Sequence, residues 1–263
     1  MKTGTKRVEA LARGLHVLQA VQALPGASLH ELHGRTGLPK ATLLRSLRTL
    51  EDAGFVARRL ADGGYLVASL SGSASPRWLP LTEAAGPSLE ALSREIPWPT
   101  DLGVRERTAM VVLESNRRLS SIGVNRQALG ARPHMLWSAM GRAYLAFCPD
   151  AEREEILAAL RASKASEDRA ARNKAKVEKL LCIARARGYA VRDASYGVLD
   201  VGSRRQVSAI AVPVMRGGGV LACVNCVWLT DVLDEGEVVE RHLGALRAAA
   251  ARIAASLRSE PGL

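Results

Sequence analysis

The first part of the chain shows apolar positions at helical spacing. From Val8 to Leu24 apolar residues recur every three or four positions, which predicts a helix with one broad apolar face. Pro25-Gly26 ends this pattern, and the spacing of Ser28 and Glu31 is that of a capping box, which starts a second helix. Gly37 is suited to end the second helix in the left-handed conformation. The expected apolar face of the first helix consists of Leu11, Leu15, Val17, Leu18, Val21 and Leu24.

A third helix and a hairpin follow. Pro39 suits a first helical turn, and the pattern predicts a helix that runs to about Asp52. Apolar runs at 55–60 and 65–67 flank a Gly-rich turn, which indicates a β-hairpin. Three helices followed by a hairpin are typical of a winged helix-turn-helix. Its third helix is expected to pack through Leu43, Leu47 and Leu50.

A boundary and a linker come next. Residues 69–76 are mostly small and polar, which marks a domain boundary. We expect a linker helix from Arg77 to Ala85, an interruption at Gly86-Pro87, and a second helix from Ser88 to about Ile96.

The remainder mixes strand and helix signals, which predicts an α+β fold with three parts: a DNA-binding domain at 1–70, a linker at 71–87 and a larger domain at 88–263. The last helix has a heptad-like apolar stripe, which we interpret as one amphipathic helix packed on its own domain rather than a coiled coil. Strand-like stretches lie around Val104 and at 109–113, 122–124, 207–214 and 220–228, and helical ones at 151–160 and 174–187.

The net charge of the chain indicates what kind of partner the protein binds. The formal net charge is +11, which favours a polyanion, either nucleic acid or an anionic membrane surface. Residues 1–70 contain ten Lys and Arg against five Asp and Glu, so this part is the more cationic per residue. No apolar run approaches the roughly 20 residues that span a bilayer, and no secretory signal is present, so we expect a cytoplasmic, nucleoid-associated protein without a membrane partner.

The polar face of the third helix is the predicted DNA-reading surface. Arg45 can reach guanine or a phosphate, and Thr42 a thymine methyl or a phosphate. Arg58 and Arg59 of the hairpin, and Arg7 beside Lys2 and Lys6, offer backbone or minor-groove contacts. The alternatives are that these side chains only solvate a surface, or that the bundle serves protein contacts. The predicted residues of the helix are Lys40, Ala41, Thr42, Arg45, Arg48 and Thr49.

Several segments together resemble the IclR-type regulators. They are 37–51, 130–146, 188–189 and 210–214, and the likeness extends from about Val8 to Leu257. The resemblance implies a GAF-like effector domain with a curved antiparallel sheet flanked by helices. It also implies a homodimer or homotetramer, operator DNA as a partner, and RNA polymerase as a partner of an activator.

Two further segments, 97–101 and 144–149, look closer to the branch that controls 3-(3-hydroxyphenyl)propionate catabolism. An aromatic acid is therefore the favoured effector, and an aromatic-acid or related catabolic operon the favoured target. Trp137 departs from the smaller side chain common in the family, which leaves the identity of the ligand open.

The resemblance also nominates an effector pocket. Asn225 in an apolar run can hydrogen-bond a carboxylate or hydroxyl, and Arg132 can pair with a carboxylate. Trp98 and Trp137 can stack on a ring, although ordinary core packing is the alternative for both and for Met135, and a dimer contact or surface position is the alternative for Arg132. The remaining nominated residues are Leu136, Ser138, Ala209, Ala211 and Val227.

An enzyme is the competing class, in which a GAF-like domain would act on a small molecule; an architectural DNA-binding protein without effector is a third. The sequence has no nucleophile elbow, P-loop, dinucleotide fingerprint or HExxH motif, so we predict no catalytic residues and no cofactor. Cys223 and Cys226 have CxxC spacing but lie in a predicted strand, where positions three apart face opposite sides, so we predict buried free thiols rather than a metal site.

Overall fold

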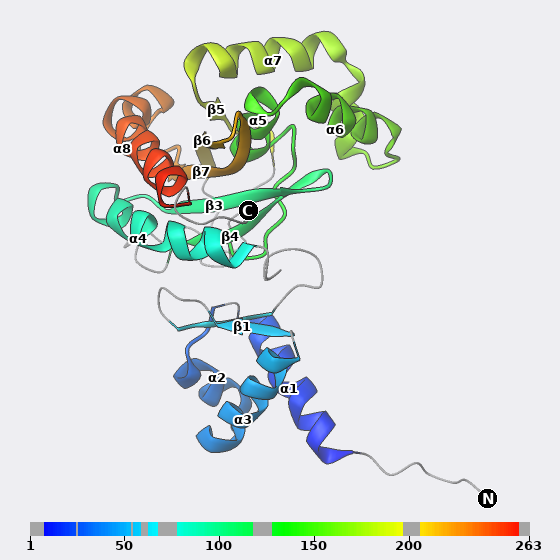
Figure 1. Cartoon of the computed structure of the whole chain (residues 1–263), viewed down its shortest axis with the longest axis vertical. Helices are drawn as coiled ribbons and strands as arrows, with labels where there is room; N and C mark the ends of the chain where they lie inside the picture. Colours follow the sequence, from blue (N-terminus) through cyan, green and yellow to red (C-terminus); the bar gives the residue numbers. More distant parts are fainter. Residues whose placement is uncertain are drawn as a thin grey trace, which may run out of the picture. The chain divides into compact units, whose positions relative to one another are not determined.

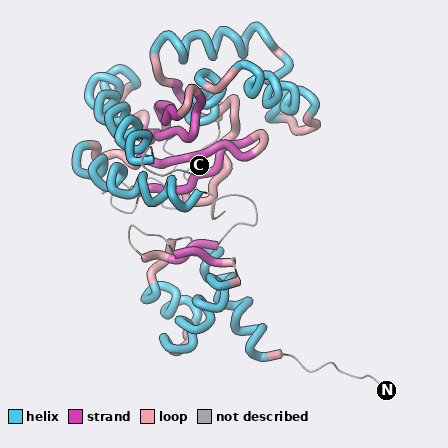
Figure 2. The backbone as a smooth tube through the Cα atoms, viewed as in Figure 1, coloured by secondary structure: helices cyan, strands magenta, loops and turns pink. Residues whose placement is uncertain are grey.

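The computed structural model describes residues 8–24, 26–53, 55–58, 63–67, 78–117, 128–196 and 206–257. The chain divides into two compact units, Met1–Leu79 and Pro80–Leu263. Helices dominate the first unit, and a sheet with helices on both of its sides forms the second (Figures 1 and 2). The strand expected at 122–124, and the predicted DNA contacts Arg7 and Arg59, lie outside the described residues.

The first unit begins with the expected helices, and the local signals that predicted them are present. Ser28 Oγ accepts from the Glu31 amide at 3.3 Å, and the Glu31 carboxylate accepts from the Ser28 amide at 2.7 Å, so the capping box forms. Gly37 ends the second helix at φ 66°, in the left-handed region that glycine enters without strain. The helices are α1 (Glu9–Ala23), α2 (Leu29–Thr36) and α3 (Lys40–Asp52).

The core of this unit is narrower than the apolar face of its first helix. Val17 and Val21 of α1 are fully buried, together with Leu32, Leu43 and Leu47 of the other two helices. The apolar face is not buried along its whole length, because Leu11 and Leu15 in the N-terminal half of α1 are 61% and 49% exposed. They border a groove of about 560 Å³ that is lined by residues of α1 and α3.

The predicted hairpin forms and is tied to the helices. Strand β1 (Val56–Arg58) runs antiparallel to β2 (Tyr65–Val67), with Val56 opposite Val67. The Tyr65 carbonyl accepts from the Gly26 amide at 2.7 Å, and the Tyr65 amide donates to Ala27 O at 2.9 Å. The turn between α1 and α2 therefore fixes the hairpin beside the helix-turn-helix, as a wing requires.

The second unit contains a fully antiparallel sheet of order β4-β3-β7-β6-β5. Helix α5 packs on β6 and β7 from one side and α8 packs on them from the other (Figure 1). The strands are β3 (Thr100–Glu106), β4 (Ala109–Ser115), β5 (Ala190–Val191), β6 (Val207–Arg216) and β7 (Gly219–Leu229). The helices are α4 (Leu79–Glu95), α5 (Ala139–Phe147), α6 (Asp150–Ala162), η2 (Glu167–Arg172), α7 (Lys174–Arg187) and α8 (Glu235–Ser256).

The expected break at Gly86-Pro87 is wrong, since α4 is one continuous helix through Pro87. Proline inside a helix costs about 3 kcal/mol because it removes a hydrogen bond and crowds the preceding turn. The buried residues of α4 continue across the proline, with Leu81 and Ala85 before it and Leu89 and Leu92 after it. This shared buried stripe keeps both halves on one axis, so packing overrides the local signal.

The start of α5 is placed by close backbone approaches. The loop before it pairs with the edge of β4, where the amides of Met110 and Val112 donate to Pro133 O and Ala131 O at 2.9 and 3.0 Å. A Cβ atom on Gly141 would lie 2.4 Å from Met135 Cα, so only glycine lets the loop cross the first turn of α5. These contacts hold the N-terminus of α5 over the sheet.

Replacing Gly141 with alanine should therefore destabilise the second unit, although alanine is the better helix former. The clash is with backbone atoms that have no freedom to rotate away, so we expect a loss of about 1–3 kcal/mol in the free energy of unfolding, measured by urea denaturation. The control is Gly244→Ala in α8, where a Cβ meets nothing within 4 Å and alanine should stabilise by up to about 1 kcal/mol. Equal effects of the two substitutions would contradict this account.

Candidate functional site

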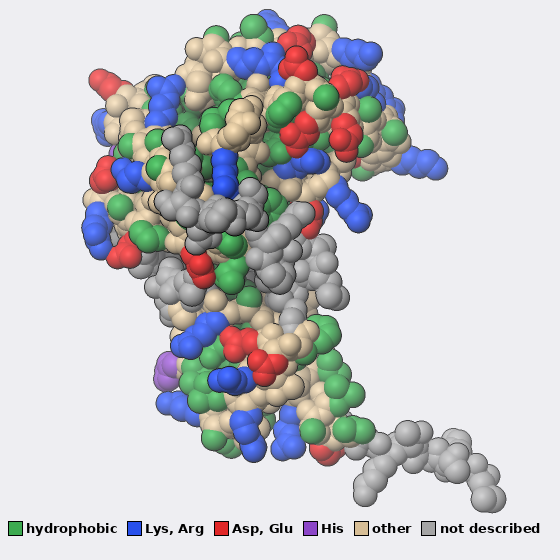
Figure 3. All heavy atoms as spheres, viewed as in Figure 1, with side chains coloured by type: hydrophobic (Ala, Val, Ile, Leu, Met, Phe, Trp, Pro, Cys, Tyr) green, Lys and Arg blue, Asp and Glu red, His purple; other side chains and the backbone are tan. Residues whose placement is uncertain are grey.

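Helix α3 presents the predicted DNA-reading surface to solvent. Leu43 and Leu47 are fully buried, whereas Arg45, Arg48 and Thr49 are exposed on the other side of the helix. Lys40 and Ala41 are exposed as well, and Thr42 is half-buried. Figure 3 shows Lys and Arg side chains spread over the viewed face of the first unit, among hydrophobic ones. Arg45, Arg48 and Thr49 thus lie on an accessible side of the helix that follows the turn, where Thr42, Arg45 and Thr49 also line the groove between α1 and α3.

Arg58 of the wing is held in place rather than loose. Its Nε donates to Gly63 O at 3.2 Å, and its guanidinium lies 5.8 Å from the centre of the Tyr65 ring. Gly63 is at φ 67°, and a Cβ there would approach Arg58 Nη2 to 3.1 Å. The turn glycine therefore leaves room for a positioned arginine at the edge of the hairpin.

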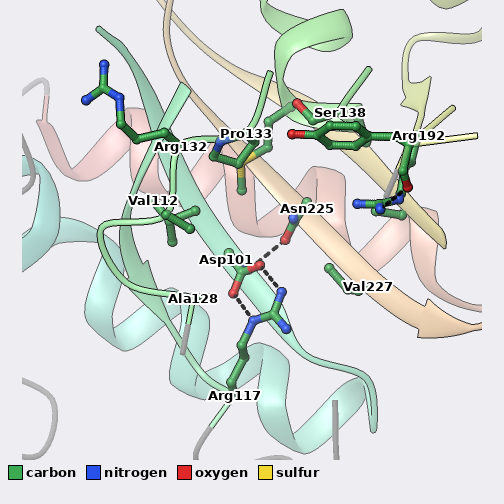
Figure 4. Close-up of a pocket in the computed structure, with 15 residues that line it drawn as sticks. Asp101, Val112, Arg117, Ala128, Arg132, Pro133, Ser138, Arg192, Asn225 and Val227 are labelled. Carbon is green, nitrogen blue, oxygen red and sulfur yellow. Dashed lines mark hydrogen bonds and ion pairs between the residues drawn. The ribbon is translucent and has the colours of Figure 1, made fainter. Parts of the chain in front are cut away.

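The second unit contains a pocket of about 130 Å³ against the inner face of the sheet. Strands β3, β6 and β7 contribute Asp101, Ala209 and the pair Asn225 and Val227 (Figure 4). Asp101 stands opposite Asn225, and Ala209 opposite Val227, so their side chains share one face of the sheet. The rest of the lining comes from Val112, Arg117, Ala128, Ala131, Arg132, Pro133, Ser138, Ala139, Met140, Arg192 and Tyr196.

A buried ion pair forms one wall of this pocket. Arg117 Nε and Nη2 donate to the two carboxylate oxygens of Asp101, each at 2.8 Å, and both side chains are at least 94% buried. Ser115 Oγ donates to the same carboxylate at 2.7 Å. Burial alone would lower the pKa of Arg117, but the adjacent Asp101 charge and its hydrogen bonds raise it, so the guanidinium stays protonated.

A second arginine lies in the opposite part of the lining. Arg192 is 7% exposed, and its guanidinium stacks 4.6 Å from the centre of the Tyr196 ring while donating to the Tyr196 carbonyl. Burial lowers the pKa of Arg192, and the charge of Arg117 lowers it further, against the opposite effect of Tyr196 and Asp193. Arg192 and Arg117 both line the pocket. Tyr196 is itself anchored, because its hydroxyl accepts from the His134 amide at 2.9 Å.

Arg142 in α5 holds the segments behind the lining together. Its Nε donates to Leu136 O at 2.7 Å, its Nη1 to Val191 O at 2.9 Å, and its Nη2 to the Asp193 carboxylate at 2.5 Å. The loop before α5 and the end of β5 are thereby fixed to the helix between them. The pocket wall is a connected polar frame rather than a set of independent loops.

Of the ten nominated effector residues, half line the pocket: Arg132, Ser138, Ala209, Asn225 and Val227. Arg132 sits at its rim, where it pairs with Glu106 and points away from Asn225 in Figure 4. Asn225 lies at the centre of the lining, with its Oδ1 accepting from the Asp101 amide at 2.8 Å.

The other five nominated residues do not line this pocket. Met135 and Leu136 are buried where the loop crosses α5, and Ala211 is fully buried on the sheet face that α5 covers. Trp137 turns toward η2, where its Nε1 donates to Glu167 O at 2.9 Å. Trp98 is 3% exposed between the prolines that precede β3.

Sequence reasoning nominated Arg132 but missed the other charged residues of the described lining, Asp101, Arg117 and Arg192. Asp101 lies near the start of β3, and Arg117 follows the end of β4, so no short sequence motif contains both residues. The signal that could have found this pair is the hairpin. Its strands reverse at Arg107 and Thr108, so residues that are equally far from the turn lie side by side, and Asp101 pairs with Ser115.

The two cysteines of the CxxC segment lie three positions apart in β7, so their side chains point to opposite sides of the sheet. Both are free and buried, and burial raises the pKa of both thiols, that of Cys226 to about 12. Among the described residues no group of three or more His, Cys, Asp or Glu side chains could hold a metal ion. No helix in the same part of the chain is long and apolar enough to cross a membrane.

Comparisons with known proteins agree with both units. The IclR helix-turn-helix domain matches residues 10–60, and the family described as bacterial transcriptional regulator IclR C-terminal matches residues 77–255. The HTH-type transcriptional regulator TsaQ1/TsaQ2 of Comamonas testosteroni is 31% identical over 224 residues, which cover 82% of this chain and 76% of that protein.

Two solved structures share the architecture. An IclR family transcriptional regulator from Brucella abortus is 25% identical, with a TM-score of 0.57 over 97% of this chain and 95% of that one. An IclR homologue from Microbacterium hydrocarbonoxydans, complexed with 4-hydroxybenzoate, is 24% identical, with a TM-score of 0.53 over 95% of this chain and 100% of that one.

A winged helix-turn-helix joined to an α/β domain with an antiparallel sheet defines a DNA-binding transcription regulator. The chain belongs to the IclR family of such regulators. The predicted fold class is confirmed, and so is the resemblance at the level of the family.

The Asp101–Arg117 pair should be essential to the second unit. Asp101→Asn preserves the shape of the side chain but leaves a buried guanidinium without its counter-charge, which should cost about 3–5 kcal/mol in the free energy of unfolding. The matched control is Asp150→Asn. The Asp150 side chain is 96% exposed, so its ion pair with Arg153 should contribute less than about 1 kcal/mol. Urea denaturation measures both, and a loss at Asp101 no larger than at Asp150 would contradict the prediction.

Proposed function

We propose that this regulator responds to a small organic acid bound in the pocket of the second unit, with an aromatic acid as the favoured effector and a catabolic operon as the target. The observation that carries the proposal is the pocket's composition. Among the described residues that line it, three are arginines, Arg117, Arg132 and Arg192, and one is acidic, Asp101; Arg117 pairs with Asp101, and Arg132 at the rim pairs with Glu106. Such a site favours an anion over a neutral or cationic molecule.

The same lining supports binding over catalysis. The described residues of the lining include no His, Cys, Lys or Glu, and the oxygen of the serine among them, Ser138, caps α5 by accepting from the Gly141 amide at 3.0 Å. A nucleophile needs a base within hydrogen-bonding reach, and the described lining offers Ser138 none. We therefore assign the pocket a sensing role without a cofactor in a cytoplasmic protein. A panel of aliphatic and aromatic acids tests this role, because thermal stabilisation by at least one of them is required.

The DNA contact follows from the accessible face of α3 and the wing. A homodimer would present two such helices to a near-palindromic operator, with Arg45 positioned to read a base and Arg58 to contact the backbone.

Arg45→Ala should reduce discrimination between operator and random DNA. Loss of one specific base contact costs about 1–3 kcal/mol, whereas non-specific binding and its salt dependence should change little. Fluorescence anisotropy with an operator selected from genomic fragments measures both affinities. Arg94→Ala in α4, an exposed arginine paired only with Glu90, is the control and should leave both unchanged. Unaltered discrimination in the Arg45 variant would remove it as a reader.

A route for the response runs from the pocket wall to α4, the helix that begins where the first unit ends. Asn116 Oδ1 accepts from the Thr100 amide at 2.7 Å, next to Asp101, and its Nδ2 donates to Leu89 O of α4 at 3.2 Å. Asn116 is 4% exposed, so its bonds compete little with water. Movement of the Asp101 wall on ligand binding is thereby passed to α4.

Asn116→Ala should therefore weaken the response without abolishing acid binding. The ratio of operator affinities with and without an effector acid should fall toward one, while the affinity for the acid stays within about threefold, because Asn116 does not line the pocket. Asn173→Ala, an exposed helix-cap asparagine of α7, is the matched control. A full response in the Asn116 variant would exclude this route.

A further inference from the structure

The positive charge of the second unit is concentrated in one segment. Residues 80–263 include 26 Lys and Arg against 21 Asp and Glu. Residues 161–187 alone have nine against three, so the rest of the unit, with 17 against 18, has no positive excess. All four lysines of the unit lie in this segment, at Lys164, Lys174, Lys176 and Lys179.

The cations of this segment are accessible. Helix α7 buries the face that carries Val177 and Leu181 and leaves its lysines exposed. In Figure 3, Lys and Arg side chains project from the end of the unit where Figure 1 shows α6 and α7, beside a group of acidic ones. The exposed cations of the segment that form no ion pair within the described part of the chain are Lys164, Arg169, Lys174, Lys176 and Lys179.

The acidic residues of the segment do not compensate this charge. The Asp168 carboxylate is bonded to His134 Nε2 at 2.7 Å, and Glu178 pairs with Arg185 at 3.1 Å. Two of the three acids are therefore engaged elsewhere, and the lysines of α7 keep their full charge toward solvent.

The start of α7 places cations where they disfavour the helix. The helix dipole favours negative charge in the first turn, and α6 and α8 each have two acidic residues there. Helix α7 has none and instead begins with Lys174 and Lys176. Lys176 and Lys179, three positions apart, also repel each other on neighbouring turns. A bound phosphate would offset both penalties, because it attracts the lysines and the N-terminus of the helix together.

DNA fits this surface better than a protein or a membrane does. Lysine is a flexible point charge and is depleted in protein interfaces, whereas B-DNA presents one negative charge about every 1.7 Å along its axis. Scattered lysines therefore find phosphates without a shaped groove. A helix that lies on a membrane needs a free apolar face, and the apolar face of α7 is buried in its own unit.

We propose that η2 and α7 form a second DNA-contacting surface, which binds phosphates of the duplex that the first unit holds. Because the first unit keeps this DNA at a high local concentration, individually weak contacts suffice. Phosphate contacts carry no sequence information, so this surface adds affinity and not discrimination. Its lysines line no part of the pocket, so effector binding does not depend on them.

Lys174→Gln/Lys176→Gln tests the proposal. On a duplex that extends several helical turns beyond the operator, affinity should fall about 5- to 50-fold at low salt, and the slope of log affinity against log salt should become shallower by about 1–2, because two phosphate contacts are lost. Random duplex of the same length should lose the same factor, so discrimination stays as in the wild type. Fluorescence anisotropy at several salt concentrations measures both.

The control, Arg94→Gln/Arg241→Gln, removes the same charge from α4 and α8, where each arginine pairs with a glutamate one turn before it. It should change neither affinity nor slope. Lys174→Glu/Lys176→Glu separates binding from folding. Acidic residues suit the first turn of a helix, so the midpoint of urea denaturation should not fall, while DNA affinity should fall further than in the glutamine variant.

Wild-type DNA affinity and salt slope in both lysine variants would overturn the proposal. If those variants bind DNA normally but support less transcription by purified RNA polymerase, the surface contacts the polymerase and the assignment to DNA is wrong. Equal losses in the arginine control would also overturn it, because the total charge of the unit, and not this surface, would then set the affinity.

Discussion

The bidentate pair of Arg117 with Asp101 is the interaction on which the pocket depends. Two buried charges are tolerated inside a protein only when each is matched in charge and hydrogen bonding. Here the match is supplied by both carboxylate oxygens and by Ser115 Oγ. The pair joins β3 to the residues after β4, and the amide of Asp101 in turn orients Asn225. One constraint therefore fixes the wall of the pocket and the donor at its centre.

The remaining frame follows the same principle on the side of α5. Close approaches require glycine at two positions, since a Cβ on Gly103 would lie 2.7 Å from Met140 Sδ and one on Gly141 would meet the loop backbone. Arg142 donates hydrogen bonds to two main-chain carbonyls and to the Asp193 carboxylate beside this packed region. The Arg142 side chain thus donates hydrogen bonds to main-chain carbonyls of the segments on either side of α5, and these bonds hold the loops of the wall in place.

The parts that sequence reasoning predicted well are those with local causes. The capping box at Ser28 and the left-handed Gly37 act within one turn of the chain, so α2 and α3 were predictable. Helix α4 was not, because its continuity through Pro87 comes from burial of a stripe that only the folded unit provides. In the pocket, Asn225 and Val227 were nominated through the resemblance to the family, and they share one face because they lie two positions apart on β7. Arg192 and Tyr196 carry no periodic signal, and their position depends on contacts between segments distant in sequence.

The same contrast explains why a sensing domain has this lining. An apolar residue in place of Asn225 would avoid the cost of burying an amide whose Nδ2 has no partner among the described residues, and would make a more stable wall. If the pocket binds an anionic effector as proposed, the ligand supplies the missing acceptor, so its binding offsets that cost and stabilises the folded unit increasingly as its concentration rises. Because Asp101 both orients Asn225 and adjoins Thr100, whose amide Asn116 accepts, the stabilised wall is the one that contacts α4. The buried amide of Asn225 is thus connected, through Asp101, Thr100 and Asn116, to α4, the helix that follows the DNA-binding unit in the chain.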